Sequence, residues 1–243
     1  MILSWIRIAI IALYAGVLSI VAFISGAVLR SPRLYHGVGR LFGKGVLLIA
    51  GIRLKVEGLD RVQFNRNYIY VSNHASMFDI PAVLAAVPAG ISLMYKQELH
   101  RVPVFGWSLA LSKVYIPVER GTTSGAMRSI EEAARKIHGG LSVLLFAEGT
   151  RTADGDLQQF KRGAFSLAVK AGVPVVPVTV NGSFLVMPKD SFRIRPGDIT
   201  VILEKPVYIP EGEVRSAEMF LRDNTRVAIE RHYISQKSGT TTT

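Results

Sequence analysis

The 243-residue chain contains no cysteine. A disulfide, a thiolate metal site and a cysteine nucleophile are therefore excluded, whatever compartment the protein occupies. Disorder over the whole chain is excluded too, because 49% of the residues are hydrophobic and the chain is long enough to bury a full core. One α/β domain is expected.

Acidic residues are missing from the first 55 positions, which carry seven lysines and arginines. The remainder holds 22 basic and 18 acidic residues, so the formal net charge of +11 is concentrated at the N-terminus. An excess of positive charge points to a polyanionic partner, such as nucleic acid, an anionic membrane surface or a phosphorylated ligand. The near balance beyond residue 55, without an RNA-reading aromatic motif, argues against nucleic acid.

Charge of either sign is also missing from residues 8–29. As a helix this run would reach about 33 Å, roughly the thickness of a hydrocarbon core, so it is predicted to be a membrane anchor. A cleaved secretory signal is the competing interpretation, but its apolar region usually has only about 7–15 residues. A helix buried in a soluble core would also be apolar on every side.

A second segment, residues 33–50, mixes leucines with Arg33, Arg40 and Lys44, and Pro32 stands where a helix would begin. The pattern predicts a basic helix at a lipid surface, so residues 1–50 form the predicted membrane-anchoring part. More cations follow the apolar run than precede it, which would place the rest of the chain on the cytoplasmic side of the inner membrane if the run spans. A helical hairpin that dips into one leaflet without crossing fits these residues nearly as well.

From residue 51 onward, short β-branched runs alternate with helical patterns over residues 126–137 and 160–171. Strands are predicted over residues 52–58, 67–73, 114–120, 141–149, 173–180 and 198–206. The alternation predicts a mixed, largely parallel sheet flanked by helices, with the ligand site outside the carboxyl ends of the strands. This domain is expected to cover residues 51–236, followed by a disordered tail at 237–243.

The strand at residues 68–71 leads directly to Asn73 and His74, followed by Asp79 and Pro81. Residues five apart in one helix lie about 140° apart, so contact between His74 and Asp79 requires a bend. Pro81 favours a helix start, which would leave His74 in the turn and Asp79 in the first helical residues. The carboxylate could then hold one ring nitrogen while the other faces substrate, which is the arrangement of a general base.

Simpler structural roles are open for the same residues: Asp79 as an N-cap, Asn73 as a turn former and His74 as a hydrogen-bonded loop residue. No Gly-x-Ser-x-Gly elbow occurs, and Ser72 and Ser76 are too near His74 in sequence for a comfortable triad. A covalent acyl-enzyme is therefore not expected. The histidine spacing also gives no zinc signature. A base here would activate a hydroxyl that belongs to the substrate.

Other polar clusters follow the strands. Glu119 and Arg120 lie at the end of one predicted strand, and the run from Glu148 to Arg151 ends the next. Lys96, Lys161 and Arg162 stand at turns or helix starts. Each cation alone is commonly a solvated surface charge. Several of them with flexible backbone at one sheet edge are suited to holding a phosphate.

These motifs together resemble the glycerolipid acyltransferases, most closely the 1-acylglycerol-3-phosphate (lysophosphatidate) acyltransferases. NHASMFD fits the family's Asn-His-x-x-x-x-Asp block, VYIPVERG its arginine block, FAEGTR its Glu-Gly-Thr-Arg block and VPVVPV its proline-bearing block. KQELHRVPVFGW resembles the segment between the first two blocks. The register holds from about Val56 to Val207. The chain departs from the family at Val118 and Glu119, where an aromatic residue and an aspartate are common.

The resemblance implies transfer of an acyl chain from a thioester of acyl carrier protein or coenzyme A to the sn-2 hydroxyl of lysophosphatidate, giving phosphatidate without metal or cofactor. His74 would take the hydroxyl proton and Asp79 would orient the imidazole. The residues implied to hold the glycerol phosphate are Lys96, Arg120, Glu148, Gly149, Thr150 and Arg151, with Asn73, Lys161 and Pro177 in support. Two alternatives stay open: a sister acyltransferase that uses glycerol 3-phosphate, another lysolipid or an aminolipid, and a non-enzymatic basic membrane binder.

Overall fold

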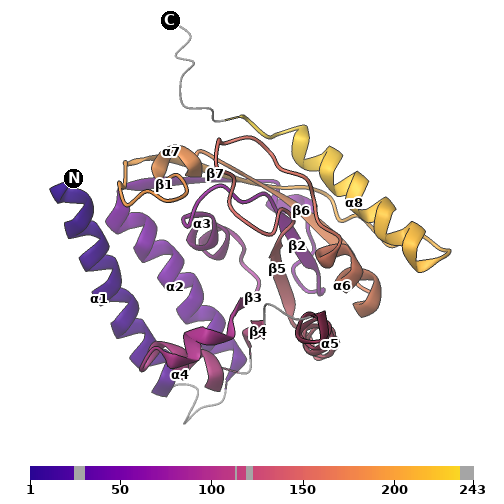
Figure 1. The fold of residues 1–243 in the computed structure, drawn as a ribbon, viewed down its shortest axis with the longest axis horizontal. Helices are drawn as coiled ribbons and strands as arrows, with labels where there is room; N and C mark the ends of the chain where they lie inside the picture. Colours follow the sequence, from indigo (N-terminus) through magenta and orange to yellow (C-terminus); the bar gives the residue numbers. More distant parts are fainter. Residues whose placement is uncertain (25–30, 113, 119–122, 236–243) are drawn as a thin grey trace, which may run out of the picture.

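Seven strands form one sheet in the order β1-β7-β6-β2-β5-β3-β4 (Figure 1). The computed structural model describes residues 1–24, 31–112, 114–118 and 123–235, so the predicted disordered tail lies outside the described residues. The strands are β1 (Ile52–Glu57), β2 (Ile69–Ser72), β3 (Ile91–Lys96), β4 (Ile116–Val118), β5 (Ser142–Phe146), β6 (Val175–Asn181) and β7 (Gly197–Leu203). Each of the six predicted strands is present, whereas β3 was not predicted.

Every neighbouring pair in the sheet is parallel except β6 and β7. The prediction of a mixed, largely parallel sheet is therefore confirmed. Because β2, β3, β4, β5 and β6 run in the same direction, their carboxyl ends meet at one edge, here called the carboxyl edge. The opposite, amino edge receives the segments that lead into these strands.

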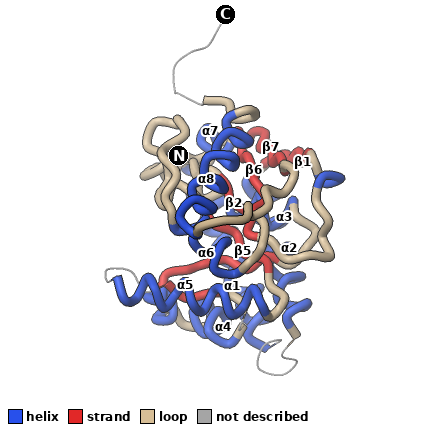
Figure 2. Tube along the Cα trace, turned by 90° about the vertical axis from the view of Figure 1, so that its right-hand side faces the viewer, coloured by secondary structure: helices blue, strands red, loops and turns tan. Residues whose placement is uncertain are grey.

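Side chains of β2 and of Tyr68, which precedes it, alternate between two apolar layers, as the period of a strand requires. Tyr68 and Tyr70 belong to a core that includes α2 (Pro32–Ala50) and α3 (Asp79–Ala86). Ile69 and Val71 belong to a second core on the other face. That core is closed by α5 (Thr123–His138), α6 (Gly163–Ala171) and α8 (Val214–Glu230). Helices therefore cover both faces, as expected for a parallel sheet (Figure 2).

The remaining helical elements are short: α4 (Phe105–Leu111), α7 (Ser183–Val186) and the 3₁₀ turns η2 (Leu59–Arg61) and η3 (Gln97–Arg101). Helix α3 begins at Asp79, directly after the turn that follows β2. Gly43 lets α2 approach α3 closely, because a Cβ at this position would lie 2.5 Å from the carbonyl oxygen of Pro81. The start of α3 is thereby fixed against the rest of the protein.

The N-terminal helices α1 (Ile2–Ile24) and α2 pack side by side along the body (Figure 1). Helix α2 begins at Pro32, as predicted, and the described part of the predicted anchor is helical. The hydroxyl of Ser4 accepts a hydrogen bond from the backbone N of Ile194 (3.2 Å), and the Tyr14 hydroxyl donates to the carbonyl of Leu41 (2.8 Å). Helix α1 is thus held to the protein at several points along its length.

Most of the remaining surface of α1 is apolar and exposed. Its exposed large side chains are Ile2, Leu3, Trp5, Ile6, Ile10, Leu13, Val17, Ile20, Val21 and Ile24. With a mean hydropathy of 2.3, α1 is long and apolar enough to cross a membrane by length and composition. Helix α4 lies beside α1 (Figures 1 and 2). It adds the exposed side chains of Phe105, Trp107 and Leu111.

Candidate active site

His74 and Asp79 meet at the carboxyl edge, as predicted. Strand β2 ends at Ser72, the chain turns, and Asp79 is the first residue of α3. The Nδ1 of His74 lies 2.8 Å from Oδ2 of Asp79. The same carboxylate oxygen accepts hydrogen bonds from the backbone N of Ala75 (2.7 Å) and of Ser76 (2.8 Å). These bonds fix the fully buried carboxylate in one orientation.

The carboxylate determines which nitrogen of the imidazole can act as a base. An ionised Asp79 accepts hydrogen bonds only, so the proton of neutral His74 is assigned to Nδ1 and Nε2 keeps its lone pair. The His74 ring also stacks on the ring of Phe146, the last residue of β5, with centroids 3.8 Å apart and an interplanar angle of 14°. The His74 side chain is 16% exposed, so a substrate can reach the ring.

The carboxylate of Glu148 holds the backbone of His74 in place. Its Oε1 accepts a hydrogen bond from the backbone N of His74 (2.7 Å), and its Oε2 accepts one from the backbone N of Gln158 (3.2 Å). Burial raises the pKa of Glu148 above its ordinary value, and the two backbone hydrogen bonds oppose this shift. With 2% of its surface exposed, Glu148 holds protein backbone. This placement differs from the expected contact with glycerol phosphate.

The loop after Glu148 carries the other predicted residues of its motif. Gly149 has a φ of +73°, a conformation that glycine adopts without strain. Thr150 is exposed and Arg151 is half-buried. The backbone N of Thr152 donates to the carbonyl of His74 (2.9 Å), which connects this loop to the turn after β2. Arg151 is therefore next in sequence to Thr152, which is hydrogen-bonded to the backbone of His74.

Two further cations lie at the same edge. Lys161 crosses the glycine turn, since a Cβ on Gly149 would lie 3.0 Å from its Cδ and 3.2 Å from its Nζ. Lys96 is the exposed last residue of β3, and β3 adjoins β5 in the sheet. Arg120 and Glu119 lie outside the described residues. The carboxyl edge thus brings together Lys96, Arg151, Lys161 and the His74–Asp79 pair.

Asn73 and Pro177 have structural positions. The side chain of Asn73 donates to the carbonyl of Val180 (2.9 Å) and accepts from its backbone N (2.8 Å), which continues the pairing of β2 with β6 beyond the end of β2. Pro177 is buried within β6, where its carbonyl accepts a hydrogen bond from the backbone N of Glu204 (3.0 Å). Glu204 follows the end of β7. Because proline has no N–H, Pro177 takes part in this pairing as an acceptor only.

Sequence reasoning did not identify Phe146 or Gln158 as part of the site. Phe146 is 72 positions from His74 in the sequence, and their contact arises because β2 and β5 are neighbours in the sheet. Within the described residues, no group of three or more histidine, aspartate or glutamate side chains is arranged to hold a metal ion.

The structure therefore defines an α/β protein with a mixed sheet, in which a histidine held by a buried carboxylate and several cations lie at the carboxyl edge. A family model described as Acyltransferase matches residues 53–181. The chain belongs to the acyltransferase family, which confirms the predicted resemblance and the enzyme class.

Relatives of known name agree with this assignment. The 1-acyl-sn-glycerol-3-phosphate acyltransferase of Limnanthes douglasii is 33% identical over 206 residues, which cover 84% of this chain and 72% of that protein. The enzyme of the same name from Pseudomonas aeruginosa is 35% identical over 170 residues, covering 68% and 63% of the two chains. The crystal structure of the 1-acyl-sn-glycerophosphate (LPA) acyltransferase PlsC from Thermotoga maritima is 28% identical, with a TM-score of 0.79 over 96% of this chain and 94% of that one.

Proposed function

We propose that the protein transfers an acyl chain from the thioester of acyl carrier protein or coenzyme A to the sn-2 hydroxyl of 1-acylglycerol 3-phosphate. The product would be phosphatidate, a precursor in phospholipid synthesis. The observation that carries the proposal is the 2.8 Å contact between Nδ1 of His74 and Oδ2 of Asp79 at the carboxyl edge. The relatives' names supply the acceptor, and the cations around the histidine suit its phosphate.

In the proposed mechanism, Nε2 of His74 removes the proton from the acceptor hydroxyl as its oxygen attacks the thioester carbonyl. Asp79 stabilises the imidazolium that forms. When the tetrahedral intermediate collapses, the new ester C–O bond is kept, the C–S bond breaks, and the imidazolium returns its proton to the leaving thiolate. Atoms and charge balance without a covalent enzyme intermediate, which agrees with a chain that lacks cysteine.

Arg151, Lys161 and Lys96 are proposed to bind the phosphate, with Arg120 beyond the described residues as a further cation. Thr150 and the turn at Gly149 would contribute polar groups next to it. Glu148 would act indirectly, because both of its carboxylate oxygens accept hydrogen bonds from the backbone. The substrate phosphate and the base would then share one edge of the sheet.

The membrane attachment proposed for the protein is to one leaflet. Near its start, helix α1 is hydrogen-bonded through Ser4 to the backbone of Ile194. Near its end, Ala22 packs with Tyr35 and Val114. A spanning α1 would carry these parts of the body into the hydrocarbon. Lying flat, it would insert its exposed apolar face and keep the body in water. The acceptor and the product, which are both lipids, would then stay in the bilayer.

An acyltransferase assay on purified protein tests the proposal. Acyl carrier protein and coenzyme A thioesters are each offered with lysophosphatidate, glycerol 3-phosphate or a neutral lysolipid. We expect lysophosphatidate to be preferred and His74→Ala to lose turnover while still binding vesicles. His138→Ala, which changes an exposed histidine at the end of α5, is the matched control.

Three results would contradict the proposal. A preference for another acceptor would indicate a sister acyltransferase. Full turnover by His74→Ala would remove the general base. Absence of turnover with every acceptor, by a wild type that binds vesicles, would favour a non-enzymatic membrane binder.

A further inference from the structure

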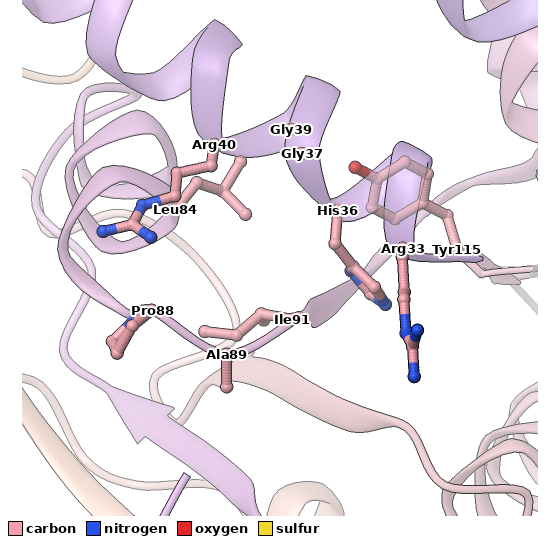
Figure 3. Close-up of a pocket in the computed structure, with 11 residues that line it drawn as sticks. Arg33, His36, Gly37, Gly39, Arg40, Leu84, Pro88, Ala89, Ile91 and Tyr115 are labelled. Carbon is pink, nitrogen blue, oxygen red and sulfur yellow. The ribbon is translucent and has the colours of Figure 1, made fainter. Parts of the chain in front are cut away.

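A cavity of about 310 Å³ lies between α2 and the segment that leads into β3 (Figure 3). It is lined by Arg33, His36, Gly37, Gly39, Arg40, Leu84, Pro88, Ala89, Gly90, Ile91 and Tyr115. Arg40 stands on one flank and His36 and Arg33 on the other, with the backbone of residues 88–91 between them (Figure 3). The lining is basic and apolar and contains no acidic side chain.

This cavity is separate from the candidate active site. Residues 88–91 enter β3 and Tyr115 enters β4, so the cavity lies at the amino edge of the sheet. His74 follows the carboxyl end of β2, which is parallel to these strands. The six-residue strand β3 separates the two edges by roughly 20 Å at about 3.3 Å per residue. One lysophosphatidate phosphate therefore does not occupy both places.

The cavity holds polar atoms without partners. Nε of Arg40 and Nδ1 of His36 are buried and have no hydrogen-bond partner in the described part of the chain. Neither Arg33 nor Arg40 forms an ion pair with an acidic residue there. Burying a guanidinium nitrogen without an acceptor is unfavourable, and an oxyanion in the cavity would supply the acceptor.

The position of the His36 ring depends on a glycine beside it. A Cβ on Gly90 would lie 2.3 Å from Cδ2 of His36, so only glycine lets the ring lie here. A Cβ on Gly39 would similarly lie 2.8 Å from the hydroxyl of Tyr115. Burial lowers the pKa of His36, so the positive charge of the cavity comes from the two arginines.

The outer surface of α2 indicates the source of the anion that the cavity would bind. Arg33, Arg40 and Lys44 fall along one line of the helix, at spacings of seven and four residues. The exposed Leu34, Leu41 and Leu48 form a second line, about 80° away on average. A helix lying in a leaflet would insert the leucines and hold the cations at the level of the lipid phosphates.

We propose that this cavity binds the phosphate of an anionic phospholipid in the leaflet, at a site distinct from the acceptor site. The arginines would contact the phosphate oxygens, and Leu84, Pro88 and Ala89 would face the apolar part of the lipid that follows the headgroup. The adjoining leucines and the exposed face of α1 make a bilayer lipid the favoured source of the phosphate rather than a free ion.

A matched pair of variants separates a built site from diffuse attraction. Arg40→Gln and Lys44→Gln each remove one positive charge from α2, one helical turn apart, but only Arg40 lines the cavity. Binding is measured on phosphatidylcholine vesicles with and without phosphatidylglycerol. We expect Arg40→Gln to weaken binding to the anionic vesicles about tenfold and Lys44→Gln to weaken it far less. Equal losses would overturn the proposal.

A second measurement identifies the ligand in solution. Dihexanoylphosphatidylglycerol, kept below its micelle concentration, and inorganic phosphate are titrated separately while the imidazole NMR signals of His36 and His74 are followed. We expect the lipid to shift the His36 signal saturably and leave His74 unchanged. Arg40→Gln should abolish the shift. If Arg40→Gln does not fold, Arg33→Gln, on the exposed flank of the cavity, takes its place in the same titration. No shift, or equally tight binding of inorganic phosphate, would overturn the proposal.

Discussion

The Oε1 of Glu148 accepts a hydrogen bond from the backbone N of His74 at 2.7 Å, so the buried acid of one loop holds the main chain of the turn that carries the proposed base. The same carboxylate holds the backbone N of Gln158. It therefore joins the loop after β5 to the turn after β2. Asp79 fixes the imidazole and Glu148 fixes the backbone that carries it.

Glu148→Gln is expected to lower kcat and leave the KM for the acceptor nearly unchanged. An amide has a single acceptor oxygen, so one of the two backbone N–H groups loses its partner, at a cost of about 1–3 kcal/mol of stability. The shifted turn would reduce kcat about tenfold to hundredfold. Steady-state kinetics and urea unfolding measure both effects. Glu131→Gln, the same change at an exposed position on α5, is the control. A rise in acceptor KM with normal kcat would instead place Glu148 on the substrate.

The raised pKa of Glu148 predicts a specific dependence of stability on pH. At pH values between the ordinary pKa of 4.5 and the raised pKa of the folded state, folded Glu148 keeps a proton that the unfolded chain has released. The folded state binds more protons in this window, so this group makes the protein less stable as pH rises towards the folded pKa. Urea unfolding at several pH values should therefore show the stability advantage of wild type over Glu148→Gln shrinking with pH. A constant or growing difference would contradict the burial argument.

Phe146 is expected to be a positioning residue for His74. Its ring stacks on the imidazole, with centroids 3.8 Å apart. Aromatic pairs of this kind contribute about 0.5–1.5 kcal/mol, so Phe146→Leu should lower kcat about three- to tenfold and leave both KM values unchanged. Phe146→Tyr keeps the stack and should restore kcat. Phe64→Leu, in the segment before β2 at the amino edge, is the control. Equal activity of Phe146→Leu and wild type would refute this role.

The sequence predicts the fold and the histidine–carboxylate pair well because both depend on local signals. A β-branched run, a turn and Pro81 are enough to place Asp79 at the start of α3. Strand β3 was missed because its sequence, ISLMYK, has one β-branched residue and fits a helix as readily. The support given by Phe146 and Glu148 depends on β2 lying beside β5, and single-sequence patterns do not specify the order of strands.

Arg151→Ala is expected to raise the apparent KM for lysophosphatidate by about tenfold to a hundredfold, with a smaller effect on kcat. The guanidinium lies in the loop bonded to His74 and has no ion-pair partner in the described part of the chain. A charge-assisted contact with phosphate is worth about 1.5–3 kcal/mol, which sets this range. Arg135→Ala, on the exposed surface of α5, is the matched loss of charge. An acceptor KM equal in the two variants would remove Arg151 from the phosphate site.

The exposed face of α1 is expected to control attachment to the bilayer without controlling folding. Leu13 is 72% exposed, so Leu13→Glu places a charge where lipid is expected and disturbs little of the core. Vesicle flotation should fall strongly, while the thermal unfolding midpoint stays near that of wild type. Val227→Glu, at a 56% exposed position on α8, should float normally. Because the thioester donors are water-soluble and the acceptor is a lipid, Leu13→Glu should lose activity on vesicle-bound lysophosphatidate but keep it on detergent-dispersed acceptor. If both variants float equally, α1 is not the surface that enters the leaflet.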